Sequence, residues 1–430
     1  MNPLANPSQI DSAIRFFLYV LIFWLPYSPA VVETCVCISI LLWILKRSII
    51  FTQTSQRDWN FKKKILYFGG AFKPVSNGLN PWIALFLFMG LLSVVGSIYP
   101  AHSFNGFLNK TFEWFIIYWL VLEVFVMPQM IHRALAIFTF TIVSTSIDSL
   151  IQFYLTNKDI FLGREIIPHS RVTAAFNTPN TLAAFLTSAI PVCLSGILIK
   201  PKAKWIRFLT IIGFFCVVWS LYLTFTRGAW QSTVLSLFFF WAAIHEKLQW
   251  SGRFLKIILP LIFIILVFFF NMYVYNNSQF SDREWQSTHW RLNIWVHTLS
   301  MIADRPFFGH GLNTYMTLLQ EYDPIARKEP TYAHNCYLQL IAETGILGFI
   351  CFSTIIFELF RKSMTQIRLI FTQQKSLAIR GIGLLSGLFA FLISSFSDNN
   401  FYSLQLSSLF WVMAGMLMAA NNIICKQIKI

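Results

Sequence analysis

The sequence has few charged residues for its length. Of its 430 residues only 12% are Asp, Glu, Lys or Arg, whereas 56% are hydrophobic, and soluble globular proteins carry about a quarter charged residues. This shortage excludes a cytosolic enzyme. Acidic residues are fewer than basic residues: the chain has 18 Asp and Glu and 33 Lys and Arg, which gives a net charge of +15. In a soluble protein that balance would suggest a nucleic-acid partner.

Several sequence motifs are absent as well. The chain has no HExxH, no CxxC and no clustered pair of histidines, so the sequence does not indicate a metal site. It also has no GxxxxGK[ST] phosphate loop. Its 7 cysteines form no disulfide framework, and we expect them to be packing residues. We therefore predict neither a metal nor a cofactor.

Long hydrophobic runs make up most of the chain. A run that crosses the hydrocarbon core of about 30 Å needs about 17 to 25 apolar residues, and we count about twelve such runs. No small-residue cleavage site follows the first run, which we expect to stay as a signal anchor. The runs begin near Ile14, Val31, Trp82, Phe112, Ala134, Leu182, Trp205, Ala229, Phe254, Tyr337, Gly381 and Tyr402.

The distribution of Lys and Arg predicts how these runs cross the membrane. With the N-terminus in the cytoplasm, the inner segments collect most of the 33 basic residues, as the positive-inside rule requires. Both termini are then cytoplasmic, and the charge of +15 reports topology, so we expect no nucleic-acid partner. The sequence thus predicts one all-α polytopic membrane domain over residues 1–430, in contact with membrane lipids.

The basic residues predicted to lie outside are mainly arginines, whereas lysine predominates inside. A guanidinium binds phosphate with two parallel hydrogen bonds, and it also stacks on Trp and Tyr, so phosphate binding and stacking both remain open. The outer cations are Lys110, Lys158, Arg164, Arg171, Arg227, Arg283, Arg291, Arg305, Arg327 and Lys328.

The longest polar stretch covers residues 274–335, between the ninth and tenth runs, and forms a large outer loop. Long ordered loops are usually functional. Ser281 and Glu284 have the spacing of a capping box, and apolar residues then recur at helical spacing until the sequence Asp304-Arg305-Pro306. We expect an amphipathic helix in the outer interface here, with Trp285, Leu292, Val296, Leu299 and Ile302 on its apolar face.

Two arginines of the outer side are candidates for function. Arg227 lies in TFTRGAWQS, in a tight turn between two apolar runs, where a charge needs a partner; the alternative is an arginine that reaches the lipid headgroups. Arg291 lies in THWRLNIW within the predicted amphipathic helix, where a cation facing the headgroups is the simpler interpretation.

The loop before the sixth run holds further polar residues. Arg164, His169 and Arg171 lie together in GREIIPHSRVTAAFNTPN. Asn180 follows Pro179 and could cap the next helix, which would explain it by structure alone.

His334 opens the segment AHNCYLQLIAETGILGF at the outer mouth of the tenth run. An imidazole titrating near neutral pH is a natural general base for a hydroxyl, although a histidine can also simply anchor the interface. Glu321, Asp323 and Tyr332 are alternative proton acceptors. Glu343 lies inside the membrane run and needs a partner there. Gly345 and Gly348 would let another helix approach closely.

The order of TRGAW, WRLNIW, RPFFGHGLNTY and HNCYLQLIAETGILG resembles the O-antigen ligase and polymerase superfamily of bacterial polysaccharide assembly. His334, Asn335, nine residues, Gly345, two residues and Gly348 match the signature His-(Asn/Ser/Gln)-x9-Gly-x-x-Gly of the ligases. The motifs cover residues 165–360, and the hydropathy pattern agrees over the whole chain. Phe349 departs from the signature, which often continues with Thr.

The resemblance implies a GT-C-like glycosyltransferase of the bacterial inner membrane whose active site faces the periplasm. Such an enzyme moves a glycan from undecaprenyl diphosphate to lipid A-core, with inversion and without a metal. By similarity, Arg227 and Arg291 would bind the diphosphate and His334 would deprotonate the acceptor. We further predict a substrate-binding group made of Arg164, Arg171, Asn180, Tyr332, Asn335 and Glu343.

Two alternatives remain at this point. An O-antigen or capsule polymerase would use the same donor with a different acceptor. A transporter would place paired charges and broken helices near the middle of the membrane. Asp148 is the chief candidate there, whereas the arginines and His334 lie at the outer edge, so the sequence favours an enzyme. It does not indicate an oligomeric state.

Overall fold

The computed structural model describes residues 7–54, 67–167, 170–199, 204–248, 278–323 and 330–428. Within these ranges the chain is helical and contains no strand beyond one isolated bridge between Lys158 and Glu165. This confirms the predicted all-α class. The run predicted from Phe254 lies outside the described residues, as do His169 and the segment that holds Arg327, Lys328 and Glu329.

The other predicted runs each coincide with a helix. In chain order the elements are α1 (Pro7–Trp24), α2 (Pro29–Thr54), α4 (Asn80–Val95), α5 (Pro100–Gly106), the π-helix η1 (Phe107–Phe112), α6 (Glu113–Val124), α7 (Pro128–Ile151), the π-helix η2 (Gln152–Thr156), α8 (Pro179–Leu198), α9 (Lys204–Leu223), α10 (Arg227–Leu248), α12 (Ser278–Asp304), α13 (Tyr315–Tyr322), α14 (Cys336–Ile370), α15 (Lys375–Ser394), the 3-10 turn η3 (Asn400–Tyr402) and α16 (Leu404–Ile428).

Proline marks many of the helix starts. Pro7, Pro29, Pro100, Pro128 and Pro179 are each the first residue of a helix. Proline is well tolerated there, because its missing N–H would have no partner within the helix and its φ is already helical. The sequence therefore sets these boundaries locally, before any packing is considered.

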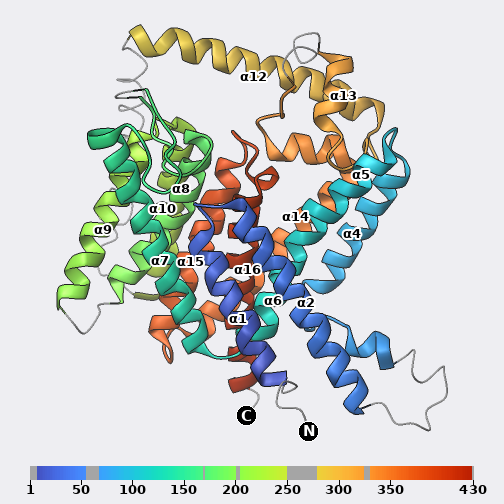
Figure 1. Cartoon of the computed structure of the whole chain (residues 1–430), viewed down its shortest axis with the longest axis vertical. Helices are drawn as coiled ribbons and strands as arrows, with labels where there is room; N and C mark the ends of the chain where they lie inside the picture. Colours follow the sequence, from blue (N-terminus) through green and yellow to red (C-terminus); the bar gives the residue numbers. More distant parts are fainter. Residues whose placement is uncertain are drawn as a thin grey trace.

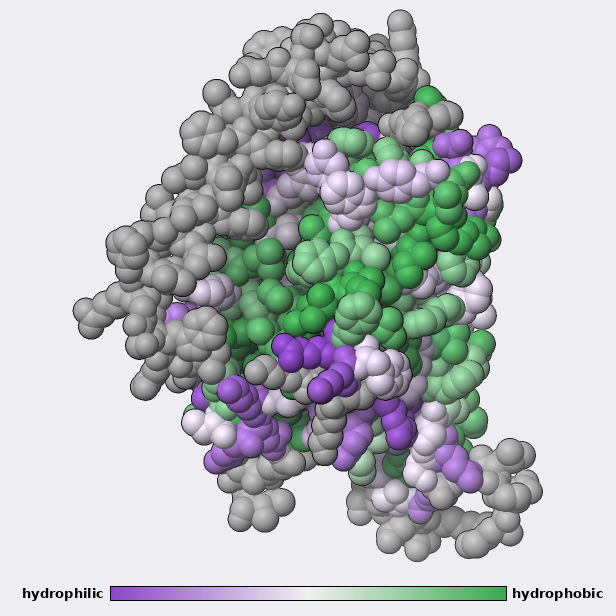
Figure 2. All heavy atoms as spheres, turned by 90° about the vertical axis from the view of Figure 1, so that its left-hand side faces the viewer, coloured by the Kyte–Doolittle hydropathy of each residue, from purple (hydrophilic) through white to green (hydrophobic). Residues whose placement is uncertain are grey.

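Six of the described helices are long and apolar enough to cross a membrane, and two shorter apolar helices cover Asn80–Val95 and Arg207–Leu223. Figure 2 shows a broad apolar band on the face in view, with polar side chains gathered mainly below it. Helices of this kind agree with an integral membrane protein. The number of spans and their direction stay predictions.

The helices pack around α16 (Figure 1). Trp411 and Phe410 of α16 are fully buried, and the helix packs against α6 and α15. α15 in turn packs against α8 and α10, α14 against α4, and α1 against α2. In Figure 1 both termini lie at one end of the bundle, whereas α12 lies across the opposite end. The predicted topology, with α12 outside and both termini inside, requires this arrangement.

α14 is broken near its start. Gly345 has a φ of 71°, which an L side chain adopts only with strain, and the helix continues beyond it. The segment after α12 lies against this break: the backbone N–H groups of His310 and Gly311 donate to the carbonyls of Ala342 and Glu343, and Ile346 donates to Pro306. A loop therefore makes the close approach at Gly345, and the prediction of a neighbouring helix there was wrong.

A group of paired charges holds three helices together at the end that carries the termini. The Lys46 ammonium of α2 lies 2.6 Å from Asp11 of α1 and 2.6 Å from Glu123 of α6, and Arg47 pairs with the other oxygen of Glu123 at 2.6 Å. The side chains of Lys46 and Glu123 are only 9% and 7% exposed. We call these four residues the inner cluster.

Candidate active site

His334 lies at the end of the bundle that α12 covers, two residues before α14. Asn335 is the N-cap of α14, and its side-chain oxygen accepts hydrogen bonds from the backbone N–H groups of Tyr337 and Leu338. This cap fixes the backbone next to His334, whose φ of 49° is unusual for a residue other than glycine. The cap occupies the Asn335 oxygen, so the substrate-binding role of Asn335 stays a prediction.

The imidazole of His334 lies between an acid and an aromatic ring. Its Nδ1 is 3.4 Å from Oδ1 of Asp398, and its ring centroid is 5.2 Å from that of Trp290 in α12. The side chains of His334 and Asp398 are 24% and 25% exposed, so both remain accessible to a substrate. Nδ1 makes no hydrogen bond to a described residue, so its contact with the carboxylate is electrostatic, and Nε2 is left to exchange a proton as a general base would.

Asp398 is a site residue that the sequence analysis missed. It lies in the segment 395–403 between α15 and α16, which is fastened to the start of α14: the Cys336 N–H donates to the Ser395 carbonyl at 2.9 Å. Burial raises the pKa of the Asp398 carboxyl, but the contact with His334, the N–H of Asn399 and the charge of Arg291 together hold it below its ordinary value. Asp398 is therefore ionised at neutral pH.

A signal for Asp398 was present in the sequence. It is the only acidic residue between the starts of the last two predicted runs, in the short polar segment SFSDNN. Nothing in that segment indicates that it packs against His334, more than sixty residues earlier. Only the packing of α14, α15 and α16 brings the two side chains together.

α12 confirms the predicted helix and corrects its details. It begins at Ser278, so Ser281 lies inside the helix and is not its cap. Ile294 and Met301 are fully buried against α13 and the start of α14, whereas Leu292, Val296 and Leu299 of the predicted apolar face are exposed. One face of α12 thus packs on the protein, and the exposed apolar face suits a lipid interface. The side chain of Trp285 lies outside the described side chains.

Arg291 lies on α12 within electrostatic reach of Asp398. Its Nε is buried, and no described residue accepts a hydrogen bond from it. A guanidinium near the segment 395–403 with an unused N–H could donate to an anionic ligand there. The simpler interpretation of Arg291, a cation that faces only lipid headgroups, does not account for this position.

Arg227 is the first residue of α10, directly after a tight turn in which Phe225 has a φ of 49°. Free N–H groups and the helix dipole favour anions at such an N-terminus. The adjacent Gly228 packs against the segment 395–403, because a Cβ on Gly228 would lie 2.6 Å from the Ser397 hydroxyl oxygen. The segment that carries Asp398 therefore links the start of α10 to His334 and Arg291.

The predicted substrate-binding residues Arg171 and Asn180 lie beside this turn. The Arg171 guanidinium donates to the Thr224 carbonyl at 2.7 Å, to the Asn180 side chain at 2.5 Å and to the Thr226 hydroxyl at 2.8 Å. Asn180 does not cap α8, because Thr178 is the N-cap and accepts from the N–H of Thr181. Arg171 thus ties the entry of α8 to the turn that positions Arg227.

The remaining predicted ligands lie apart from this turn or are enclosed. Arg164 donates to the side chain of Asn177. Glu343 is 1% exposed, and it accepts hydrogen bonds from Gln339 at 3.2 Å and from the Tyr402 hydroxyl at 3.1 Å. Gln339 and Tyr402 are therefore the partners that a carboxyl group inside the membrane run requires. A direct contact of Arg164 or Glu343 with substrate stays a prediction.

Two of the three alternative proton acceptors, Tyr332 and Asp323, are less suited than His334, whereas Glu321 is exposed and stays an alternative. Burial and the nearby charge of Glu343 raise the pKa of Tyr332, so its phenol stays protonated at neutral pH and cannot act as a base. Asp323 is 2% exposed. In the part of the chain that the structure describes, no three His, Cys, Asp or Glu residues are grouped as metal ligands would be.

Fold and site together define a helical membrane protein with a histidine–carboxylate pair and arginines at one end of the bundle. A family model described as O-antigen ligase matches residues 212–353, about a third of the chain, and supports an assignment of the protein to the O-antigen ligase family. No curated protein matches the sequence. The matched segment contains Arg227, Arg291 and His334 but not Asp398 or Arg171. This family of glycosyltransferase-like ligases and polymerases, together with the apolar helices, indicates a multi-pass membrane protein.

Proposed function

We propose that the protein is an O-antigen ligase of the bacterial inner membrane, with a GT-C-like arrangement and an active site on the periplasmic face. It would transfer a glycan from undecaprenyl diphosphate to a hydroxyl of lipid A-core. The observation that carries the proposal is the convergence of the His334–Asp398 pair, Arg291 and the start of α10 on the segment 395–403. The family match over residues 212–353 supports the class of reaction.

In this reaction the bond between the anomeric carbon and the diphosphate oxygen breaks, and a bond from the acceptor oxygen to the same carbon forms. Attack from the opposite face inverts the linkage. His334 takes the proton of the acceptor hydroxyl at Nε2, and ionised Asp398 holds the ring and stabilises the charge that it gains. Neither step requires a metal.

The arginines act on the leaving group. Negative charge builds on the diphosphate as it departs, and cations already positioned at that place lower the barrier. Arg291 offers an unused buried N–H and Arg227 lies at a helix N-terminus, so both suit a diphosphate. Arg171 stabilises the turn before α10 through its hydrogen bonds to the Thr224 carbonyl and the Thr226 hydroxyl. The amphipathic α12 would cover the donor at the membrane surface.

The test uses purified protein with undecaprenyl-diphosphate-linked glycan in EDTA, with and without lipid A-core, and resolves the products by gel and mass spectrometry. We expect glycan on lipid A-core. Longer lipid-linked glycan without use of lipid A-core would instead identify a polymerase. Transport of intact donor without any new glycosidic bond would overturn the proposal of an enzyme.

A further inference from the structure

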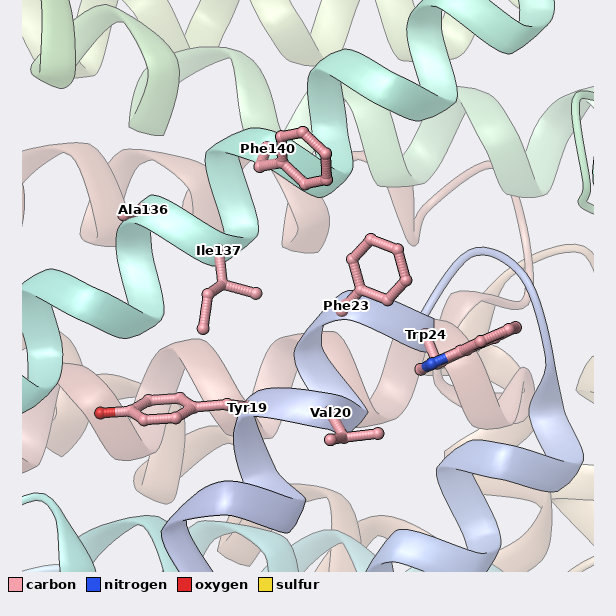
Figure 3. Close-up of a pocket in the computed structure, with 7 residues that line it drawn as sticks. All are labelled: Tyr19, Val20, Phe23, Trp24, Ala136, Ile137 and Phe140. Atoms are coloured by element: carbon pink, nitrogen blue, oxygen red, sulfur yellow. The ribbon is translucent and has the colours of Figure 1, made fainter.

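An open apolar groove lies between α1 and α7, away from the candidate active site. It has a volume of about 460 Å³. Figure 3 shows its walls: Tyr19, Phe23 and Trp24 come from α1, and Ala136, Ile137 and Phe140 come from α7. Phe140 is 64% exposed. The residues that form the proposed reaction site have no part in this groove.

The groove has a basic end. Arg15 and Arg133 both act electrostatically on the Tyr19 hydroxyl, which donates to the Met130 carbonyl at 3.1 Å. Arg15 is held by protein acceptors, since it donates to the Val124 carbonyl at 2.9 Å and to Ser12 at 3.0 Å. Arg133, by contrast, is exposed. One end of the apolar groove therefore carries two cations: Arg15, which protein acceptors hold in place, and Arg133, which is exposed.

The level of this basic end in the membrane follows from the fold. Arg133 lies in the second turn of α7, and Arg15, midway along α1, donates to the Val124 carbonyl at the end of α6, so both lie toward the end of the bundle that carries the termini. In the predicted topology that end faces the cytoplasm, where anionic lipid headgroups attract basic residues and basic pockets between helices bind them.

We propose that the groove binds an anionic phospholipid of the cytoplasmic leaflet. Its phosphate lies at Arg133 and Arg15, and one acyl chain lies between α1 and α7 along Tyr19, Phe23 and Phe140. The complementarity of one negative headgroup to two guanidinium groups selects this occupant over a neutral lipid. The inference rests on the predicted orientation and not on the proposed reaction.

The test is native mass spectrometry of the purified full-length protein, incubated with equal amounts of phosphatidylglycerol and phosphatidylcholine that carry the same acyl chains. We expect the wild type to retain phosphatidylglycerol preferentially. Arg133→Gln should lower that preference about fivefold, as expected for one cation near a charged membrane surface. Ala136→Trp, at an exposed position, should fill the groove and lower the retention of both lipids.

Lys375→Gln is the matched control, because it removes an exposed charge near the start of α15, which does not line the groove. It should retain lipid as the wild type does. Equal retention of the two lipids by the wild type, or equal behaviour of Arg133→Gln and Lys375→Gln, would overturn the proposal. A dimer that buries the groove without lipid would also overturn it. None of these outcomes depends on glycan transfer.

Discussion

The two ends of the bundle use charged side chains in different ways. In the inner cluster, Lys46 and Arg47 are matched by Asp11 and Glu123 at 2.6 Å, largely shielded from solvent. At the other end, His334 faces Asp398 at 3.4 Å, both side chains remain partly exposed, and Arg291 keeps a buried N–H that no described residue accepts. The pairs of the inner cluster are shorter and more buried than the His334–Asp398 pair, although the Arg47 Nε, like that of Arg291, is buried with no acceptor among the described residues.

The contrast separates structural charges from chemical ones. A buried ion pair that satisfies itself holds helices together, and breaking it leaves a costly unpaired charge. A longer pair whose side chains are partly exposed leaves both groups open to contact by a substrate. Substitutions in the inner cluster should therefore change stability, and substitutions at the proposed reaction site should change the rate of transfer.

The largest effect is expected for His334→Ala. Loss of a general base slows a reaction by about 10² to 10⁴-fold, and the ring is partly exposed, with a ring contact to Trp290. The transfer rate per folded molecule should fall by about that factor, while the melting temperature in detergent stays near that of the wild type. Transfer at the wild-type rate would remove His334 from the mechanism.

Glu123→Gln should lower the stability of the protein and leave the transfer rate unchanged, the opposite of His334→Ala. It breaks the pairs with Lys46 and Arg47 in a buried setting, and loss of one partner from such a pair costs about 3–5 kcal/mol. Thermal unfolding should report this loss, and the surviving folded protein should transfer glycan at the wild-type rate. The comparison of the two ends fails if stability is unchanged and the rate falls.

Arg291→Lys should lower the rate by about 100-fold, the scale on which a single stabilising donor acts at a developing charge. Lysine keeps the charge but lacks the planar fork that binds phosphate with two hydrogen bonds. Arg305→Lys is the control, because Arg305 donates to the Gly96 carbonyl and lies after the end of α12. Equal rates for the two variants would show that the planar fork of Arg291 does not contribute to the rate.

The smallest effect concerns the stability of Asp398→Asn. The folded-state pKa of Asp398 is lowered from the ordinary value of 3.8, so its ionised form contributes stability that is fully present above that value and is lost as the pH falls through the lower folded-state pKa. The melting temperature of the wild type should exceed that of the variant at about pH 7, and the difference should close as the pH falls through the lowered folded-state pKa of Asp398. A gap that does not change with pH would contradict the ionic role of Asp398.

The sequence predicted the helical class and the position of most helices, because hydrophobic length and prolines at helix starts act locally. It also predicted α12 and its end at Asp304. It misjudged Gly345, since only tertiary packing reveals that the backbone of a loop fills the space where a Cβ would be. The predicted start of α12 at Ser281 was also wrong, because the helix begins at Ser278 and already includes Ser281.

Within the site, the residues with strong local context were easier to find. A charge in a tight turn indicated Arg227, and a histidine at a loop–helix boundary indicated His334. Asp398 was missed because its importance depends on a contact between segments far apart in the chain. Asn335 was assigned to substrate, yet its oxygen serves the N-cap of α14. Local patterns mark unusual residues but do not show which of them meet.

The central claim is that the arginines bind the donor while His334 acts on the acceptor. Its most direct test is the dissociation constant for the undecaprenyl-diphosphate-linked donor, measured for wild type, Arg227→Gln, Arg291→Gln and His334→Ala in the absence of acceptor. The account predicts weaker binding for both arginine variants and wild-type binding for His334→Ala. Unchanged affinity in the arginine variants, or a loss confined to His334→Ala, would contradict it.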